Sequence, residues 1–302
     1  MKCLVTGGAG FIGSNLTDKL IEMNHEVIVI DNESATENDN FYWNEKAENH
    51  KIDVCDYEKI EPLFKGVDWV FHLAAQSRIQ PAIENPIKTV RINCEGTTNI
   101  LQASRKHNVK KVMYSSTSAY YGLKNEPPQV ETMERNCLNP YSVTKVAAED
   151  LCKMYTDLYD LKTVIFRYFN VYGDRQPTRG QYAPVIGLFQ RQKMNDEPMT
   201  IVGDGEQTRD YTNVLDVVNA NIMAAESDNV GNAEVFNVGY GESHSILDLV
   251  DMIGGDYIHI PARKGEARHT QADTTNIKNK IGWKAQIMLK DYIYNWRKNG
   301  SN

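Results

Sequence analysis

The chain has 302 residues, of which 41% are apolar and 24% charged, a composition typical of folded globular domains rather than of disordered or repetitive sequence. Its net charge of −7 and its pI near 5.6 argue against a protein that binds nucleic acid. No apolar run reaches the length of a membrane span, and no signal-peptide segment precedes the first glycines, so we expect a cytoplasmic protein without a membrane partner. The five cysteines show no Cys-x-x-Cys spacing, so neither a metal site nor a disulfide framework is predicted.

The amino end predicts a strand, a glycine turn and a helix. A short buried strand over residues 2–6 leads into Gly7-Gly8-Ala9-Gly10-Phe11-Ile12-Gly13, and a helical run follows from 14 to 23. Glycines at this spacing permit a tight turn and let the backbone approach a pyrophosphate. The second strand, 26–30, ends at Asp31, where an acid would bind the adenosine ribose and repel a 2′-phosphate. The motif therefore predicts NAD rather than NADP.

Further strands alternate with helices. We expect strands over 51–54, 69–73 and 109–114, and helices over 57–64 and 88–107, with the stretch from 32 to 49 too polar for a core. His72, within an apolar strand, is interpreted as a core histidine rather than a catalytic one. Ser115, Ser116 and Thr117 follow the strand that ends at 114. Open parallel sheets bind ligands at such ends, and one of these hydroxyls could orient a substrate hydroxyl.

A tyrosine and a lysine share one face of the next predicted helix. Asn139 suits an N-cap and Pro140 a first helical position, and the helix is expected to run to about residue 159. Tyr141 and Lys145 would then lie in its first turns, one turn apart. Because the helix dipole and the lysine both favour a phenolate, we expect the pKa of Tyr141 to fall towards the range of a general base. Alone, such a pair is more often exposed surface.

The alternation continues with a strand over 162–168. It predicts an α/β fold, a Rossmann-type doubly wound parallel sheet with a smaller carboxyl-terminal substrate domain. We assign residues 1–173 to an NAD-binding domain, with returning segments near 213–240, and 174–302 mainly to the substrate domain. Within the latter we expect a helix over 182–193 and a strand over 199–202.

Together these motifs resemble a known family, the extended short-chain dehydrogenase/reductases, and within it the nucleotide-sugar epimerases related to UDP-glucose 4-epimerase. The resemblance covers nearly the whole chain. The motifs that carry it are the glycine segment 6–13, Asp31-Asn32, Asp53-Val54, His72-Leu73-Ala74-Ala75, Asn93-x-x-Gly96-Thr97, Ser115-Ser116-Thr117, Tyr141-x-x-x-Lys145 and the segment 167–173.

The resemblance implies an enzyme with NAD as cofactor, a UDP-sugar as substrate and Thr117, Tyr141 and Lys145 as catalytic residues. It implies cofactor contacts from Gly7, Gly10, Phe11, Ile12, Gly13, Asp31, Asn32, Asp53, Val54, Leu73, Ala74, Ala75, Asn93, Ser115, Tyr141, Lys145 and Tyr168. It implies substrate contacts from Thr117, Tyr141, Asn170, Arg209, Arg263, Glu266 and Thr270, with the two arginines at the diphosphate and Glu266 at the nucleoside ribose. It also implies a homodimer formed through the helices at 88–107 and 140–159.

By resemblance, Tyr141 takes the proton from the C4 hydroxyl of the sugar while a hydride passes from C4 to the nicotinamide. The 4-keto sugar then turns over in the pocket and the hydride returns to its opposite face, so that C4 is inverted. Thr270 stands where the family has a residue lining the sugar pocket, small in enzymes that also accept N-acetylhexosamines. Interconversion of UDP-GlcNAc and UDP-GalNAc is therefore expected beside that of UDP-glucose and UDP-galactose.

Other functions remain open from the sequence. The related dehydratases place an Asp-Glu pair directly after the catalytic threonine, where this chain has Ser118 and Ala119, and the decarboxylases usually keep a glutamate in place of Ala119. A reductase of the same group is a further alternative. A non-enzymatic NAD-binding regulator would be expected to lack Thr117, Tyr141 or Lys145, and all three are present.

Overall fold

The computed structural model describes residues 1–35, 38–179, 183–262, 265 and 267–299. Its centre is a seven-stranded sheet in the order β10-β6-β5-β4-β1-β2-β3, with every neighbouring pair parallel. The strands are β1 (Lys2–Thr6), β2 (Glu26–Asp31), β3 (Glu48–Lys51), β4 (Trp69–His72), β5 (Lys111–Thr117), β6 (Thr163–Tyr168) and β10 (Asn232–Val238). The predicted doubly wound parallel sheet is confirmed. The strand order reverses between β1 and β4, where sheets of this kind bind ligands.

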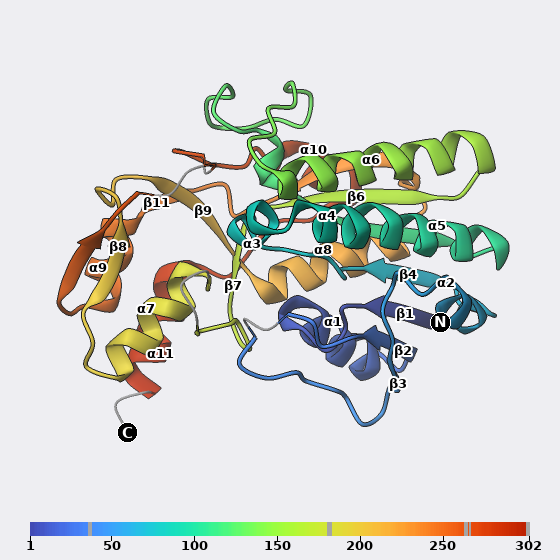
Figure 1. The fold of residues 1–302 in the computed structure, drawn as a ribbon, viewed down its shortest axis with the longest axis horizontal. Helices are drawn as coiled ribbons and strands as arrows, with labels where there is room; N and C mark the ends of the chain where they lie inside the picture. The colour runs from blue at the N-terminus through green and yellow to red at the C-terminus, as the bar shows by residue number, and fades with distance from the viewer. Residues whose placement is uncertain (36–37, 180–182, 263–264, 266, 300–302) are drawn as a thin grey trace.

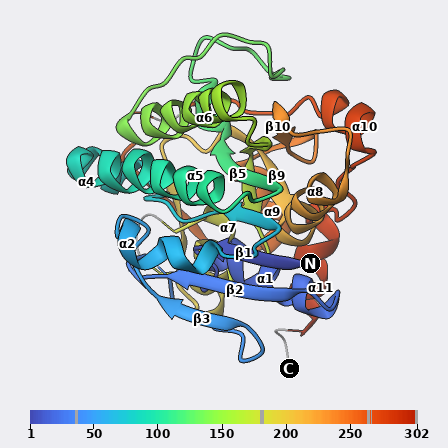
Figure 2. The ribbon, with the colours of Figure 1, turned by 90° about the vertical axis from the view of Figure 1, so that its right-hand side faces the viewer.

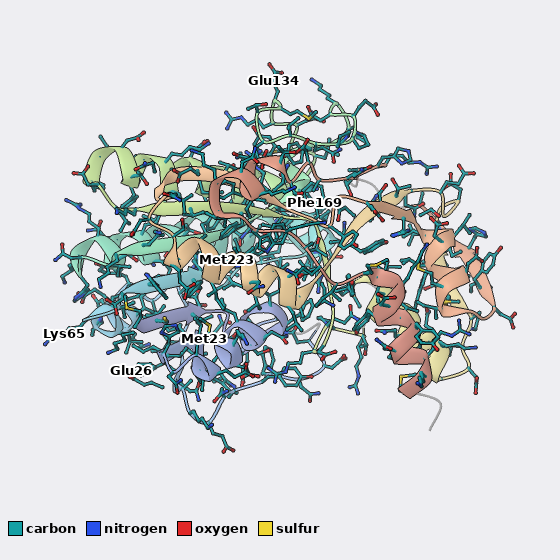
Figure 3. All side chains as sticks on the ribbon, turned by 180° about the vertical axis from the view of Figure 1, so that it is seen from behind. Met23, Glu26, Lys65, Glu134, Phe169 and Met223 are labelled. Carbon is teal, nitrogen blue, oxygen red and sulfur yellow. The ribbon has the colours of Figure 1, made fainter. Side chains whose placement is uncertain are left out.

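Helices cover both faces of this sheet, which explains why its central strands are almost wholly buried (Figure 2). On one face, α1 (Phe11–Glu22), α8 (Val214–Glu226) and α10 (Thr275–Ile281) enclose one apolar core. On the other face, α2 (Tyr57–Ile60), α5 (Thr97–Lys106) and α6 (Pro140–Tyr159) enclose a second core. Figure 3 labels Met223 of α8, which packs against the first core, and Glu134, on the loop that projects between β5 and α6.

Several boundaries differ from the prediction, each for a local reason. The third strand is Glu48–Lys51 rather than 51–54: it lies at the edge of the sheet, where side chains are exposed, so its polar sequence carries no strand signal. Helix α1 begins at Phe11, inside the glycine segment. Strand β5 starts two residues later than predicted and ends at Thr117, so that the three hydroxyl residues belong to its buried carboxyl end.

The helix predicted at 88–107 is three consecutive segments. These are α4 (Pro86–Val90), a π-helical turn (Arg91–Gly96) and α5. A short helix, α3 (Ile79–Glu84), precedes them and was not predicted; Pro81 is its third residue. Asn85 separates α3 from α4, and its side chain accepts a hydrogen bond from the Lys88 backbone N–H at 3.0 Å.

The smaller lobe lies beyond the carboxyl ends of the large sheet (Figure 1). It holds α7 (Val185–Met194), α9 (Ile246–Ile253) and α11 (Leu289–Asn299), packed around a third core, and a two-stranded sheet of β8 (Met199–Val202) and β12 (Tyr257–Ile260). A three-stranded sheet joins β7 (Asn170–Tyr172), which was not predicted, to β9 (Thr208–Asn213) and β11 (Ser243–Ser245). Between these segments the chain returns to the large sheet through α8 and β10. The domain division at residue 173 stays a prediction.

Candidate active site

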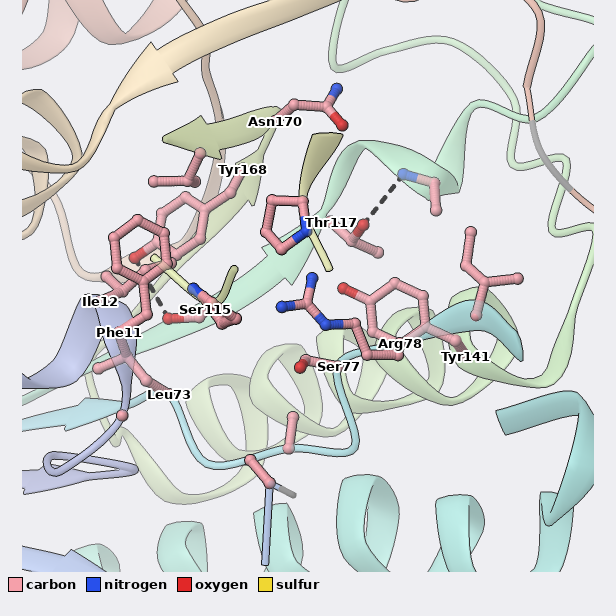
Figure 4. Close-up of a pocket in the computed structure, with 18 of the residues that line it drawn as sticks. Phe11, Ile12, Leu73, Ser77, Arg78, Ser115, Thr117, Tyr141, Tyr168 and Asn170 are labelled. Atoms are coloured by element: carbon pink, nitrogen blue, oxygen red, sulfur yellow. Dashed lines mark hydrogen bonds between the residues drawn. The ribbon is translucent and has the colours of Figure 1, made fainter. Parts of the chain in front are cut away.

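One cavity of about 520 Å³ follows the carboxyl ends of the parallel strands and continues to the smaller lobe. Residues that follow β1, β2, β3 and β4 line one end, and β5, α6, β7 and β9 contribute to the other. Figure 4 shows the part of it around Ser115, Thr117 and Tyr141. A single pocket therefore brings together segments that are far apart in the sequence.

The glycine turn after β1 is shaped so that side chains cannot occupy it. Gly7 has a φ of +69°, and a Cβ atom on it would lie 2.9 Å from the backbone nitrogen of Ala74. A Cβ on Gly13 would lie 2.1 Å from the Gly7 carbonyl oxygen. The turn can therefore present its backbone, and the amino end of α1, directly to a phosphate.

Asp31 lies at the end of β2 beside this turn. Its carboxylate accepts hydrogen bonds from the backbone N–H groups of Ala9 at 3.1 Å and Glu33 at 2.8 Å. Burial raises the pKa of Asp31, and these backbone hydrogen bonds oppose the rise. The acid expected to bind the adenosine ribose thus also fixes the loops on both sides of it.

The next strand end supplies a second polar pair. Asn32 donates from Nδ2 to Asp53 at 3.0 Å, and Asp53 accepts a further hydrogen bond from the Cys55 backbone N–H at 2.8 Å. Val54 is buried next to Gly96, where an added Cβ would approach Val54 Cγ2 to 2.8 Å. The glycine of the Asn93-x-x-Gly96 motif therefore lets the helix approach the pocket wall.

Helix α6 begins as predicted. Asn139 is its N-cap, accepting a hydrogen bond from the Ser142 backbone N–H at 2.8 Å, and Pro140 is its first residue. Tyr141 and Lys145 consequently lie in its first two turns and both line the pocket. Thr117, the last residue of β5, lies near the Tyr141 ring, and Ala119 N–H donates to its hydroxyl at 3.1 Å (Figure 4).

The predicted fall in the Tyr141 pKa is wrong for this structure. Burial raises the pKa of Tyr141, and the rise is opposed by hydrogen bonding with Thr117 and by the positive charge of Arg78. Burial also lowers the pKa of Lys145 to about 8. The Lys145 Nζ lies 4.7 Å from the centroid of the Tyr114 ring. Burial of the phenol is therefore the largest influence on its pKa, and the positive charge that opposes the rise is that of Arg78.

Hydrogen bonds connect the remaining strand ends. Ser115 donates to the Tyr168 hydroxyl at 3.2 Å, and Asn221 of α8 donates to the same hydroxyl at 2.6 Å. These bonds hold the Tyr168 ring in the wall of the pocket between Ser115 and Asn170 (Figure 4).

An ion pair lies behind the reactive residues. Glu149, one turn after Lys145, accepts two hydrogen bonds from Arg167 of β6 at 2.8 and 3.0 Å, and both side chains are at most 2% exposed. Ser116 donates to the same carboxylate at 2.5 Å. The pair ties α6 to β5 and β6, so it fixes the helix that carries Tyr141 against the strand that carries Thr117.

His72 fits its interpretation as a core histidine. It is buried between the hydroxyls of Thr6 at 2.7 Å and Thr97 at 2.9 Å, and burial lowers its pKa to about 3. A neutral imidazole between two hydroxyls has a structural role.

Most of the predicted site residues line the one pocket. They are Gly7, Gly10, Phe11, Ile12, Gly13, Asp31, Asn32, Asp53, Val54, Leu73, Ala74, Ala75, Ser115, Thr117, Tyr141, Lys145, Tyr168, Asn170, Arg209 and Thr270. Arg263 and Glu266 lie outside the described residues.

Asn93 is the exception among the described residues. It is 1% exposed and does not line the pocket. Its side chain bonds to the backbone N–H of Gln76 at 2.8 Å, to the Gln76 carbonyl at 3.1 Å and to the Thr144 hydroxyl at 3.0 Å. Asn93 therefore positions the loop after β4 against α6, and its predicted contact with the cofactor stays a prediction.

Arg78 and Tyr211 are among the lining residues that the sequence did not predict as site residues. Tyr211 follows Arg209 by two residues on β9, and its strand period alone could have placed it on the same face. Its hydroxyl and that of Thr270 are buried, and neither has a hydrogen-bond partner among the described residues. Two polar atoms in the pocket wall are thus available to a ligand.

Comparison with known proteins agrees with this geometry. The sequence profile of the NAD dependent epimerase/dehydratase family matches residues 3–239. A putative UDP-glucose 4-epimerase of Methanocaldococcus jannaschii is 40% identical over 99% of each chain. A UDP-N-acetyl-alpha-D-glucosaminuronate decarboxylase of Bacillus cytotoxicus is 34% identical, covering 92% of this chain and 90% of its own. The crystal structure of UDP-glucose 4-epimerase from Thermotoga maritima with UDP-glucose has a TM-score of 0.91 at 36% identity, over 99% of each chain.

Proposed function

Since the chain belongs to the NAD dependent epimerase/dehydratase family, we propose that it inverts C4 of a UDP-hexose through a 4-keto intermediate. UDP-glucose and UDP-galactose are the first substrate pair. The relatives named UDP-glucose 4-epimerase span the full chain and support this activity, while the decarboxylase relative leaves a second chemistry to be tested.

The residues of the pocket fit NAD. The glycine turn leaves room for a diphosphate, and Asp31 carries the acid that suits an unphosphorylated adenosine ribose. Leu73, Ala74 and Tyr168 line the path from there to Tyr141. When bound, NAD supplies the oxidation of C4 and its subsequent reduction.

The chain's own residues then hold the substrate and move one proton. Tyr141 accepts the proton of the C4 hydroxyl, and Thr117 orients that hydroxyl from the end of β5. Lys145, one turn after Tyr141 on α6, binds the nicotinamide ribose. Arg209 binds the diphosphate, so that the nucleotide is held firmly while the sugar remains able to turn over.

The observation that carries the proposal is the meeting of Thr117, Tyr141 and Lys145 in one pocket that has no acid after the threonine. Ser118 and Ala119 both line the pocket there. Removal of water across C5 and C6 calls for an acid–base pair at these positions, and related decarboxylases usually keep a glutamate at the second of them. This absence favours epimerisation over both alternatives.

We also propose that the substrate range includes UDP-GlcNAc and UDP-GalNAc. Thr270 is 6% exposed and lines the pocket, and its backbone N–H donates to the Thr208 carbonyl at 3.1 Å, which fixes it beside β9. A threonine leaves more room for an acetamido group at C2 than a large aromatic residue would.

Two measurements on the purified protein test the function. The compound released on denaturation is identified by its UV spectrum and mass, and the protein is incubated with UDP-glucose, UDP-GlcNAc and their C4 epimers. We expect NAD in the released fraction and interconversion within each pair. A 4-keto-6-deoxy sugar as the main product of any of these nucleotide sugars, or a UDP-pentose formed from UDP-glucuronate in a parallel incubation, would contradict the proposal.

A further inference from the structure

Asp210 lies within β9, and its two neighbours in the sequence both line the pocket. Its own side chain is completely buried and does not line the pocket. Within the described part of the chain, its carboxylate accepts hydrogen bonds from three backbone N–H groups, those of Tyr240 at 2.7 Å, Gly241 at 2.9 Å and Ala272 at 3.0 Å. One side chain thus joins β9 to two other segments of the chain.

The three donors need a carboxylate with both oxygens free to accept. Burial raises the pKa of Asp210 to about 6, and the three hydrogen bonds oppose the rise. At neutral pH the side chain is therefore ionised and only accepts hydrogen bonds. Oδ2 accepts from Gly241 and Ala272, and Oδ1 accepts from Tyr240. An asparagine has an NH2 group in place of one oxygen, so it would leave at least one backbone N–H facing another donor.

The segment 268–272 runs beside the start of β9 and contacts Arg209. The Arg268 carbonyl accepts one hydrogen bond from the Thr208 N–H at 3.1 Å and another from Arg209 Nη1 at 3.1 Å. Arg209 Nη1 also donates to the Thr208 carbonyl at 3.0 Å. Two backbone carbonyls, one of β9 and one of the neighbouring segment, therefore direct the guanidinium that is proposed to bind the diphosphate.

The other end of this segment is held by Asp210. Ala272 carries the N–H that Asp210 accepts, and the two residues pack closely: a Cβ on Gly239 would lie 2.3 Å from Ala272 Cβ and 2.8 Å from Asp210 Oδ2. Thr270 lies between the two ends of the segment and lines the pocket. Loss of the anchor at Ala272 should therefore displace the part of the pocket wall that Thr270 and Arg209 form.

We propose that Asp210 is a positioning residue for the substrate: it holds the 268–272 segment against β9, and through that segment it keeps Arg209 directed at the diphosphate of a UDP-sugar. The inference rests on the proposed function and adds to it a residue outside the pocket. The diphosphate does not change during the proposed reaction, so weaker binding of it affects the ground state and the transition state equally. Loss of Asp210 should therefore raise KM more than it lowers kcat.

The test measures the affinity for UDP, which contains the diphosphate and lacks the sugar, by calorimetry on the purified protein. We expect Asp210→Asn to bind UDP about 5- to 30-fold more weakly. Its KM for UDP-glucose should rise by a similar factor, while kcat changes less than about threefold and the NAD content stays the same. If Asp210→Asn does not fold, Gly239→Ala takes its place with the same expected results, because it separates Ala272 from Asp210 and keeps the carboxylate.

Asp216 of α8 provides a matched control. It is 4% exposed, it does not line the pocket, and its carboxylate accepts hydrogen bonds from the backbone N–H groups of Gln286 at 3.1 Å and Ile287 at 3.0 Å. Asp216→Asn disturbs a buried carboxylate of the same kind, so it should lower the stability of the protein and leave the affinity for UDP unchanged.

A double-mutant cycle shows whether Asp210 acts through Arg209. In Arg209→Gln, the further change Asp210→Asn should alter the affinity for UDP by at most about twofold, because the group that Asp210 positions is already absent. The same loss with and without Arg209 would overturn the inference, since Asp210 would then act on the fold in general. An unchanged affinity in Asp210→Asn, or an equal loss in Asp216→Asn, would also overturn it.

The outcomes separate this inference from the proposed function. If the sugars are interconverted and the affinity for UDP does not respond to Asp210→Asn, only the inference fails. If no sugar is interconverted and the affinity for UDP falls as expected, the proposed function fails and the inference stands. An unmodified protein that does not bind UDP would overturn both.

Discussion

Lys145 lies on the buried face of α6, where desolvation lowers its pKa to about 8. The proposed chemistry needs its charged form, which holds the nicotinamide ribose. Because the ammonium is protonated below this pKa, kcat should decline as the pH rises through about 8. An arginine stays charged throughout that range, so in Lys145→Arg the remaining activity should lack this alkaline decline. A decline at the same pH in both proteins would exclude Lys145 as its source.

Substitutions at Thr270 test how much space the pocket leaves around C2 of the sugar. Its small side chain lines the same pocket as Arg209 and Tyr211. A tyrosine at this position should obstruct an acetamido group when the 4-keto sugar turns over, with overpacking costs of about 1–3 kcal/mol. We expect Thr270→Tyr to lose at least tenfold in kcat/KM on UDP-GalNAc while retaining activity on UDP-galactose. Thr270→Ser is the control, and equal losses on both substrates would show that the position does not set the range.

At the scale of elements, the pair between Glu149 and Arg167 joins α6 to the sheet. Removal of its charge leaves Arg167 buried without its partner, so Glu149→Gln should lower the free energy of unfolding by about 3–5 kcal/mol. Asp150 provides a control on the same helix, because its pair with Arg135 has side chains 58% and 63% exposed. Asp150→Asn should cost less than about 1 kcal/mol. Urea denaturation measures the free energy of unfolding of both variants. Similar losses in the two would contradict this account of the pair between Glu149 and Arg167.

Elements with a strong local signal could be predicted from the sequence, whereas those defined by their surroundings could not. β1, β2 and β4 are short apolar runs that both helical layers bury, and α6 carries its cap in Asn139 and Pro140. β3 lies at an edge and is polar, and β7 has three residues and depends on its pairing with β9. The residues of β3 and β7 themselves do not reveal which strands lie beside them in the fold.

The candidate site shows the same division. Residues with a motif, such as Gly7, Asp31 and Tyr141, line the predicted pocket. Asn93 belongs to a motif, but its side chain forms hydrogen bonds with Gln76 and Thr144. The motif predicts that the residue lies near the pocket, and it does not predict the direction of the side chain. Arg78 has no motif, and only the fold shows that it approaches Tyr141. The pKa of Tyr141 also depends on burial, which the spacing of two residues cannot reveal.

For the whole molecule we propose a homodimer formed by α4, α5 and α6. Exposed apolar side chains gather on α4 and α6, among them Ile87 at 83%, Val143 at 53% and Leu158 at 66%. The polypeptide has a mass of 34.3 kDa, so light scattering at micromolar concentration should report about twice this value. Val143→Glu should shift the mass towards that of one chain. Leu215→Glu, at an equally exposed residue of α8 on the other face of the sheet, should not. A single-chain mass for the unmodified protein would refute the dimer.

The central claim is that C4 is oxidised and reduced within one pocket, with Tyr141 as the base. It is tested most directly with UDP-glucose that carries deuterium at C4, incubated with the protein in ordinary water. The account predicts UDP-galactose that retains the deuterium at C4, since the hydrogen removed from one face returns to the other, and no product with Tyr141→Phe although NAD stays bound. Replacement of the C4 deuterium by solvent hydrogen, or near-normal turnover by Tyr141→Phe, would contradict it.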